Sequence, residues 1–480
     1  KSKLVDKAGH NLSAKVPSSG GQAQIRQIMS SFNLKDILKS KLVDKVLKSY
    51  KDQAPWMVLV LDEHTARIVG SCCQLSSLVE NGFVAIQDIR LRRQHIELPA
   101  LYFIQPQKDV VTLVAKDFDP GMVAEKQLKA KYTKAYVHFS QRLPKDLMLT
   151  LSSEKRFAER VKALCEVNMD FAALESRVYT LNTPYALETL LFPKSQEKLI
   201  SLLEQCSNQL CTLCVTLNER PNIRYRAPLS RDGPDEDKHC KFLARILHGD
   251  SKDEGDLDRM IKNLPNWKPN DNPATLLIVD RQIDPIAPLL HEVTYQAAIL
   301  DSLSVNMNVL SMQDPEDSKI SKRYILDEED KWWKDYRHRH VNELLSNLKD
   351  AAKKFREENE VAVGGDASEW DSKQMLKKVR DFPAYREFSK QYKKHIEILT
   401  RIFKHHLKPL QQDALGLEQD MATGMDSRGG RPTKDYLDRL KRVVNDASVS
   451  ALSKARVVMT YILTQGGIPA REKDSIFGAL

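Results

Sequence analysis

The 480-residue chain is too long for one ordinary hydrophobic core, so we expect two to four domains. Its hydrophobic content of 41% and charged content of 29% are typical of globular proteins, and its net charge of +9 favours acidic partners or an anionic membrane surface. No apolar run has the length of a transmembrane helix, no nucleic-acid-binding motif occurs, and the seven cysteines follow no disulfide spacing, which suits a reducing cytosol.

The start of the chain contains an exact repeat, because "KSKLVDK" occurs at 1–7 and again at 39–45. A structural repeat preserves pattern rather than letters, and the stretch between the copies has the Ser, Gly and Pro content of a linker. From Met29 onward the sequence looks like a natural beginning, with apolar residues at helical spacing over 34–47. We therefore expect residues 1–28 to be a disordered or artefactual extension.

Short apolar runs that alternate with helix-like stretches dominate the next part of the chain. Such runs are typical of buried parallel strands, and their spacing predicts a doubly wound α/β domain. They cover residues 56–62, 83–89, 100–106 and 135–140. Helical periodicity then dominates from 155 to 220, with a strand-like run at 170–181. Cys211 and Cys214 form a CxxC motif inside an apolar helical stretch, which predicts core packing rather than a zinc site.

The strand-like run "ATLLIVD" at 274–280 leads into a polar group that has two interpretations. Asp280, Asp284 and His291 together would suit an α/β hydrolase-like enzyme, since acids at the ends of parallel strands do catalyse. Alternatively, Asp280, Arg281 and Asp284 form a buried structural clasp, with Asp284 tying the turn at Pro285. No P-loop, Rossmann, nucleophile-elbow or HExxH motif occurs, so we favour the clasp and expect no metal and no enzyme.

The second half of the chain is mainly helical. The ranges 341–360 and 385–410 each have one apolar stripe, and a polar Gly-containing loop lies between them, which predicts a protruding helical hairpin over about 341–415. That shape suits gripping other helices. Pro383 interrupts the helical pattern, so residues 373–380 are not expected to extend straight into the second helix.

Several motifs in chain order resemble the SM family, the Sec-one/Munc-eighteen syntaxin-binding proteins, and within it the exocytic branch most closely. They are "VLVLDEHTARIVGSCC", "PNIRYR", "LLIVDRQIDPIAPLLHEVTYQAAILDSL", "LDEEDKWWKDYRHRHVNEL" and "LEQDMATGMD". The resemblance implies a cytoplasmic SNARE-binding regulator of vesicle docking and membrane fusion that needs no cofactor. Its partners would be a syntaxin-type SNARE, the assembled SNARE bundle and a vesicle SNARE, with indirect membrane contact and no nucleic acid. An alternative within the family is action at an endosomal or other internal membrane rather than the plasma membrane.

The resemblance also implies an arch with a central cleft, built from two α/β parallel-sheet domains and one helical domain. The first domain would run over 29–168, the second over 169–283 and the helical third, with the hairpin, over 284–480. Family members continue well past the point that matches Leu480, and a returning segment completes their second domain. We therefore expect a C-terminally truncated chain that exposes apolar sheet surface in the second domain.

Residue by residue, the resemblance implies two binding sites and one switch. The syntaxin cleft would use Asp62, Arg67, Arg92 and Arg93, whereas Gln74 and Gln87 stand where the family has charged contacts. An outer pocket for a syntaxin N-terminal peptide would suit a short peptide with one basic and one apolar anchor. Its lining would be Leu143, Leu147, Met148, Val161, Leu164 and Glu166. Pro383 corresponds to a hairpin proline that the family ties to a folded-back state hiding a SNARE-binding surface.

Overall fold

The structure is a computed structural model. It describes residues 32–119, 122–123, 126–127, 129–226, 239–250, 253–313, 321–363, 383–410, 413–425 and 435–480. The chain divides into two compact units, residues 1–222 with 245–275 and residues 223–244 with 276–480. The sequence-based boundary near 168 lies inside the first unit, and the expected extension at 1–28 lies outside the described residues.

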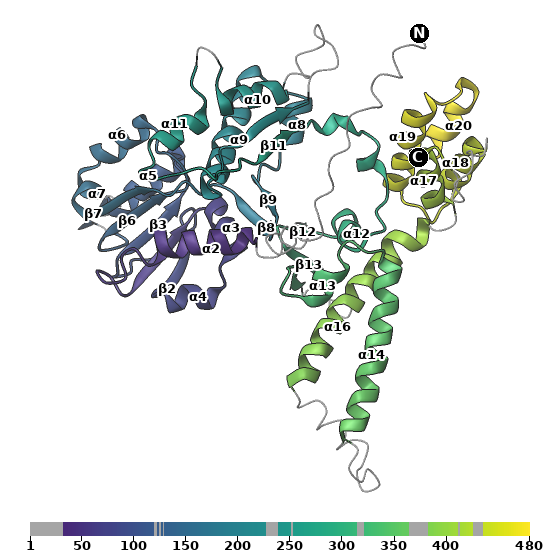
Figure 1. The fold of residues 1–480 in the computed structure, drawn as a ribbon, viewed down its shortest axis with the longest axis horizontal. Helices are drawn as coiled ribbons and strands as arrows, with labels where there is room; N and C mark the ends of the chain where they lie inside the picture. The colour runs from purple at the N-terminus through teal and green to yellow at the C-terminus, as the bar shows by residue number, and fades with distance from the viewer. Residues whose placement is uncertain are drawn as a thin grey trace. The chain divides into compact units, whose positions relative to one another are not determined.

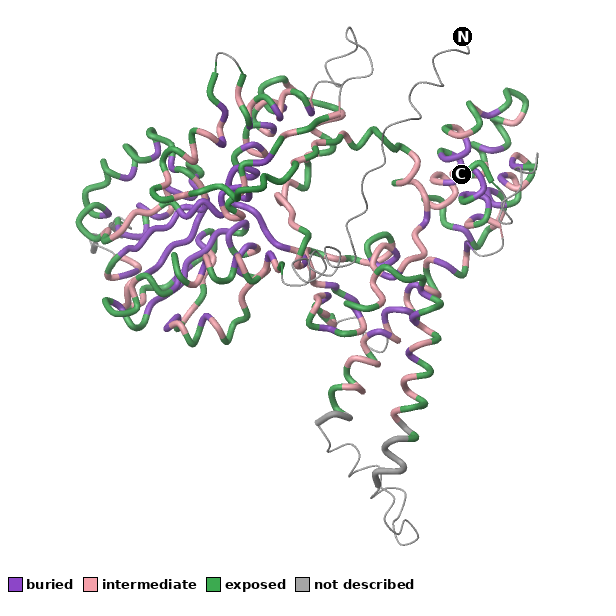
Figure 2. The backbone as a smooth tube through the Cα atoms, in the orientation of Figure 1, coloured by how far each residue is buried: buried purple, intermediate pink, exposed green. Residues whose placement is uncertain are grey.

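A five-stranded parallel sheet forms the centre of the first unit (Figure 1), with strand order β2-β1-β3-β6-β7. Every residue of β1, β3 and β6 is buried (Figure 2), because helices cover both faces of a parallel sheet. The strands are β1 (Met57–Leu61), β2 (Phe83–Asp88), β3 (Ala100–Ile104), β6 (Ala135–Phe139) and β7 (Val161–Glu166). Four of these strands confirm the sequence-based prediction, whereas β7 lies in a stretch that we expected to be helical.

Helices on both faces complete this α/β layer. On one face α5, α6 and α7 pack onto the large core cluster that includes Tyr102, Val114, Phe139 and Leu147. The other face is covered by α2, whose buried Leu34, Leu38 and Leu42 recur at helical spacing, and by α3. These helices are α2 (Leu34–Leu42) with a π-helical turn (Val43–Leu47), α3 (Glu63–Cys72), α4 (Leu75–Glu80), α5 (Lys108–Phe118), α6 (Lys145–Ser153) and α7 (Lys155–Arg160). A short β4–β5 pair (Met122–Val123, Lys126–Gln127) follows α5.

The segment expected to form a second parallel-sheet domain contains only two-stranded sheets in the described residues. The strand-like run at 170–181 is an antiparallel hairpin of β8 (Ala172–Glu175) and β9 (Val178–Thr180). β10 (Asn222–Tyr225) pairs with β11 (Thr275–Ile278), and the hydrogen bonds from Asn222 to Ala274 and from Arg226 to Ile278 make this pair parallel. Leu277 and Val279 are 62% and 53% exposed. The accompanying helices are α8 (Ala186–Leu191), α9 (Gln196–Thr216), α10 (His239–His248) and α11 (Asp256–Lys262).

The second unit is mainly helical and has two hydrophobic clusters. One cluster joins α12 (Tyr295–Ser302), a small antiparallel sheet, α13 (Lys331–Tyr336) and the hairpin helices α14 (Val341–Val363) and α16 (Pro383–Ile402). The sequence did not predict that sheet, which consists of β12 (Val305–Asn306), β13 (Val309–Gln313) and β14 (Ser321–Ile325). The two hairpin helices lie side by side (Figure 1), as expected from their apolar stripes.

The second cluster packs the C-terminal helices of this unit against one another. After α16 the chain continues through a π-helical segment (Phe403–Leu407) and a short 3-10 turn (Lys408–Leu410). The following helices are α17 (Ala414–Thr423), α18 (Tyr436–Asn445), α19 (Ala451–Gln465) and α20 (Lys473–Gly478).

Candidate functional site

Asp62 lies at the carboxyl end of β1 and is a structural residue. Its Oδ1 accepts a hydrogen bond from the Thr65 amide at 2.8 Å, and the Thr65 hydroxyl accepts one from the Asp62 amide, which closes a capping box at the start of α3. Its Oδ2 accepts a hydrogen bond from the Gln105 amide at 2.6 Å. Asp62 is only 3% exposed. Its carboxylate joins β1, α3 and β3, and its contact with a partner stays a prediction.

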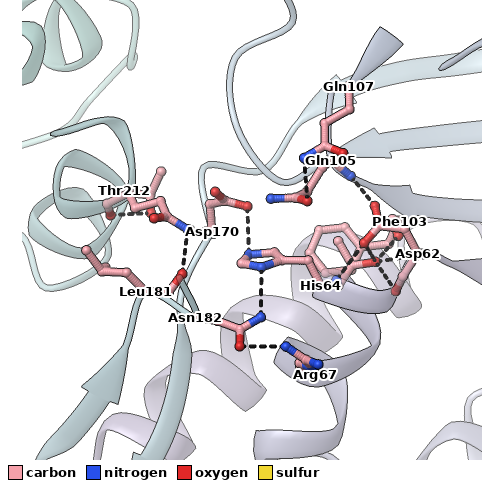
Figure 3. Close-up of polar contacts among 12 residues, drawn as sticks. Asp62, His64, Arg67, Phe103, Gln105, Gln107, Asp170, Leu181, Asn182 and Thr212 are labelled. Atoms are coloured by element: carbon pink, nitrogen blue, oxygen red, sulfur yellow. Dashed lines mark hydrogen bonds and ion pairs between the residues drawn. The ribbon is translucent and has the colours of Figure 1, made fainter. Parts of the chain in front are cut away.

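A polar network beside Asp62 fixes the position of Arg67 (Figure 3). His64 Nε2 lies 3.1 Å from Asp170 Oδ1. Burial lowers the pKa of His64, but the Asp170 carboxylate more than offsets it, so the pKa of His64 lies above its ordinary value. Arg67 donates hydrogen bonds to Asn182 Oδ1 and Glu63 Oε1, each at 2.6 Å. Its side chain is 25% exposed, so Arg67 can face a partner only from this fixed position.

The two neighbouring arginines after β2 have opposite environments. Arg93 is buried, with its side chain 3% exposed, and donates two hydrogen bonds to Asp117 at 2.6 and 3.0 Å. It also donates to the Tyr132 hydroxyl and to the Ile89 carbonyl. Arg92 is exposed. Of the predicted pair, Arg93 is therefore a core ion pair, and only Arg92 is placed to meet a partner.

The two glutamines that depart from the family pattern lie on neighbouring elements. Gln74 is exposed and immediately precedes α4. Gln87 is half-buried in β2 and accepts a hydrogen bond from the Tyr132 hydroxyl. Because Tyr132 also contacts Arg93, Gln87 belongs to the edge of the buried Arg93–Asp117 group.

An exposed apolar surface next to Gln74 was missed by the sequence analysis. Leu75 and Val79 on α4 are 66% and 57% exposed, and Val84 and Ile86 on β2 are 52% and 41% exposed. We call these four residues the α4–β2 surface, since α4 packs beside β2 and β2 is the edge strand of the sheet. The signal in the sequence is that "FVAI" is apolar at every position, whereas a half-buried edge strand normally alternates. Exposed apolar side chains on neighbouring elements make this surface a candidate protein-binding site.

The residues predicted to bind an N-terminal peptide gather on the opposite edge of the sheet, where a pocket of about 420 Å³ opens between α6 and β7. Four of the six predicted residues line it, together with three that were not predicted. The lining is Phe139, Leu143, Lys145, Met148, Leu164, Cys165 and Glu166. Leu147 is instead buried in the core below α6, and Val161 packs against the same core at the start of β7.

One acidic and one basic side chain line this pocket together with its apolar residues. Glu166 is exposed, and its Oε1 accepts a hydrogen bond from the Leu143 amide at 2.9 Å, which fixes the carboxylate beside the apolar lining. Lys145 is exposed on the first turn of α6. Met148 is 47% exposed at the same helix. An apolar pocket with a fixed carboxylate suits a short peptide that carries one apolar and one basic side chain.

The expected buried clasp at Asp280, Arg281 and Asp284 is wrong in its detail. Arg281 and Asp284 are exposed, and Arg281 donates to the backbone carbonyl of Asp284 rather than to a carboxylate. Asp280 accepts from the Gln282 amide, and Asp284 Oδ1 accepts from the amides of Ile286 and Ala287 at 3.0 Å. Both acids cap turns after β11, which accounts for them without a substrate.

His291, the third residue of the alternative enzyme, has a different partner. Its Nδ1 lies 2.8 Å from Glu418 Oε1, and its amide donates to Glu418 Oε2 at 3.0 Å. Both side chains are 1% exposed, so this pair ties the segment before α12 to α17. Each of the three candidate catalytic residues thus has its own structural partner.

The hairpin prediction concerns residues that the structure describes only in part. α16 begins at Pro383, a first helical position that tolerates proline. Residues 364–382, which include the expected break at 373–380, lie outside the described residues. Farther along the hairpin, Phe355 of α14 stacks on Phe388 of α16 with ring centroids 4.3 Å apart. The switch role of Pro383 stays a prediction.

Cys211 and Cys214 are buried in α9, where burial raises the pKa of Cys214 to about 11 and also raises the pKa of Cys211. In the part of the chain that the structure describes, no group of three His, Cys, Asp or Glu side chains is arranged to hold a metal ion. Among the described residues, no helix is both long and apolar enough to cross a bilayer.

Comparison with known proteins gives one consistent result. Residues 57–477 match the Sec1 family. The chain is 29% identical over 447 residues to the protein transport protein sec1 of Dictyostelium discoideum, covering 92% of this chain and 70% of that protein. It is 30% identical over 412 residues to the SNARE-interacting protein KEULE of Arabidopsis thaliana, covering 82% and 59%. The chain thus spans 59–70% of the length of these two curated relatives.

A solved structure has the same fold over most of the chain. It is the crystal structure of the Unc18–syntaxin 1 complex from Monosiga brevicollis, which aligns with a TM-score of 0.74 and 26% identity. The alignment covers 93% of this chain and 76% of that chain. Structural neighbours of this kind confirm the α/β-plus-helical fold class.

Proposed function

The chain belongs to the Sec1 family, and we propose that it is a binding protein that holds a syntaxin-type SNARE and promotes SNARE assembly during vesicle docking and membrane fusion. Two relatives support this proposal by their names, one as a SNARE-interacting protein and one as a complex with syntaxin 1. The observation that carries it is the pocket between α6 and β7, because four residues predicted for N-terminal peptide binding line one cavity there.

We further propose that binding uses two surfaces of the α/β layer. The pocket takes an N-terminal peptide of the syntaxin, and the α4–β2 surface with Arg92 and Arg67 takes its folded helical part. The two surfaces lie at opposite edges of the sheet, since β2 and β7 are its edge strands. A single partner would therefore need an extended segment between its peptide and its helical domain, as a disordered linker provides.

The pocket gives the first testable prediction. Met148→Lys is expected to lower the affinity for the N-terminal peptide of the cognate syntaxin by about ten- to a hundredfold, because burying an apolar side chain of this size contributes about 1.5–3 kcal/mol. Leu149→Lys is the matched control, since Leu149 is 68% exposed on the same helix but does not line the pocket. Anisotropy of a labelled peptide measures both affinities. Equal affinities for the two variants would remove the pocket from the proposal.

The α4–β2 surface gives the second testable prediction. Leu75→Glu combined with Val79→Glu is expected to weaken binding of a full cytosolic syntaxin by about tenfold or more, since apolar anchors dominate interfaces. The affinity for the isolated N-terminal peptide should stay unchanged. Leu187→Glu on α8, also at an exposed apolar position, is the control. Calorimetry with the two ligands separates the surfaces, and a loss of peptide affinity in the double variant would show that it is misfolded.

We propose that the protein is cytoplasmic and acts in exocytosis at the plasma membrane, because its motifs resemble the exocytic branch most closely. A pulldown of candidate syntaxins, each with and without its N-terminal peptide, tests this. Preference for a plasma-membrane syntaxin supports the proposal. Preference for an endosomal syntaxin would move the protein to internal membranes, and failure to capture any syntaxin would contradict the function.

A further inference from the structure

The two helices of the hairpin differ in charge. The range 383–410, which covers α16 and the two short helical segments after it, carries seven Lys and Arg residues against two acids. The range of α14, 341–363, carries four Lys and Arg residues against five acids. A hairpin that needed charge only for solubility would mix both signs on both helices, as α14 does. The excess on α16 therefore calls for a separate explanation.

α16 is fixed in rotation, so its charges face a defined direction. Its buried residues Ile398, Leu399 and Ile402 pack into the core of the helical unit. His395, which is fully buried, has Nδ1 2.7 Å from the Tyr295 hydroxyl and Nε2 2.9 Å from Asp330 Oδ2. Lys394 pairs with the same carboxylate at 2.7 Å. This anchoring fixes the rotation of α16. Glu397 and Arg401 contact β14 and β13, and Lys390 and Lys393 lie exposed on the same helix.

Four exposed lysines lie along α16 and the two short helical segments after it, and we call them the lysine stripe: Lys390 and Lys393 on α16, Lys404 in the π-helical segment and Lys408 in the 3-10 turn. The spacing of three residues places Lys390 and Lys393 on one side of α16. Among the described residues none of the four has a carboxylate within 4.0 Å. Glu397, the acid on the same side, is bound to the Tyr324 hydroxyl at 2.9 Å.

The chemistry of the lysine stripe limits the class of partner that it can bind. A surface that binds another protein usually carries apolar or aromatic anchor residues, and lysine is depleted in protein–protein interfaces. Nucleic-acid phosphates favour the bidentate guanidinium of arginine. Several exposed, flexible and strongly hydrated ammonium groups fit a diffuse surface of negative charge, in which each charge can move to meet a lysine.

We propose that the lysine stripe adsorbs directly to the anionic headgroups of a lipid bilayer. The side of α16 opposite the stripe is buried in the protein core, so the helix lies on the surface through charge and does not insert. This contact is independent of the SNARE-binding function proposed above. It would hold the hairpin along a membrane before any SNARE is engaged, and it departs from the sequence-based expectation of purely indirect membrane contact.

Binding of the full chain to lipid vesicles that carry no other protein tests the proposal. The chain should co-sediment with vesicles of phosphatidylcholine and phosphatidylserine, should not co-sediment with phosphatidylcholine alone, and should be released by high salt. The combined substitution Lys390→Gln, Lys393→Gln and Lys404→Gln is expected to lower the partition coefficient by about a hundredfold, since each lysine near an anionic surface contributes about fivefold.

The matched control removes the same charge from the other helix. Lys349, Lys353 and Lys354 are exposed on α14, and their replacement by Gln should leave vesicle binding nearly unchanged. Equal losses in the two triple variants would overturn the proposal, because net charge alone would then explain binding. Binding to vesicles of phosphatidylcholine alone would also overturn the proposal. Binding of the chain to duplex DNA without any binding to vesicles would overturn it as well. Syntaxin affinity is measured in parallel, so a failure here is distinct from a failure of the proposed function.

Discussion

Replacing Arg93 by methionine is expected to lower the free energy of unfolding of the α/β layer by about 3–5 kcal/mol, the usual loss when one partner of a buried ion pair is removed. Asp117 would keep its charge in a site where its own side chain is 1% exposed. It would retain Lys131 at 2.9 Å and the Tyr102 hydroxyl at 2.9 Å, so the layer should weaken without losing its fold. Amide hydrogen exchange of β1, β3 and β6 reports this free energy for the layer itself.

Arg92→Met is the matched control, because the same side chain is removed one residue earlier at an exposed position. It should leave hydrogen exchange within about 0.5 kcal/mol of the wild type while weakening syntaxin binding. Adding Asp117→Asn to Arg93→Met should recover part of the lost stability, since the buried carboxylate that has lost its guanidinium partner is then gone. If Arg93→Met were as stable as Arg92→Met, the buried ion pair would not be stabilising and Arg93 would again be a candidate surface contact.

The adjacent pair Arg92 and Arg93 shows where sequence reasoning on this chain ends. Both residues matched the resemblance equally well, and nothing local distinguishes them. Their environments differ because Asp117, 24 residues later on α5, lies beside one of them. Asp62 is similar: the resemblance assigned it to the syntaxin cleft, but its carboxylate accepts a hydrogen bond from the amide of Gln105, at the end of another strand. Burial and pairing set by distant segments cannot be read from spacing.

The elements that were predicted correctly are those with a strong local pattern. β1, β3 and β6 are uninterrupted apolar runs, and α16 has one apolar stripe over its whole length. β7 was missed because "VKALCE" follows directly on α7 and is too short to show a period of its own. The strands β12 to β14 were missed because they are short antiparallel strands inside a charged, mainly helical region.

Four of the residues assigned to the peptide pocket lie together for a physical reason. Leu143, Met148 and Leu164 are apolar side chains whose positions follow from the register of α6 and β7. An apolar pocket is built by the fold itself, and the same helix and strand that place one wall place the others. The resemblance assigned Leu147 to the pocket, but one position before Met148 the side chain on α6 points into the core.

His138, at the centre of β6, is expected to make the α/β layer acid-sensitive, and His138→Leu should remove that sensitivity. The side chain is 1% exposed, and burial lowers its pKa to about 4 from the ordinary value of 6.5. In the described chain neither ring nitrogen has a hydrogen-bond partner, and the nearest aromatic contact is the ring of Tyr50 at 5.6 Å. A neutral imidazole without polar partners is replaceable by an apolar side chain of similar volume.

The direction of the effect follows from proton binding. Between pH 6.5 and about 4 the unfolded chain binds a proton at His138 and the folded chain does not. The free energy of unfolding therefore falls as the pH falls through this window, and the full loss, on the order of 3 kcal/mol, is reached below about pH 4. In His138→Leu this contribution is absent. Wild type and variant should have similar stability at about pH 7.5, and the variant should be more stable by about 2–3 kcal/mol at about pH 4.5.

His248→Leu is the control for this experiment, because His248 is exposed at the end of α10 and its loss should not alter the acid response of the sheet. Hydrogen exchange of the sheet amides at the two pH values compares the three proteins on the same probe. Equal pH dependence of wild type and His138→Leu would mean that the folded chain accepts the proton at His138. A hydrogen-bond acceptor such as a buried water would then have to lie beside the ring. A large loss of stability in His138→Leu at neutral pH would instead show that the imidazole stabilises β6 through a polar contact.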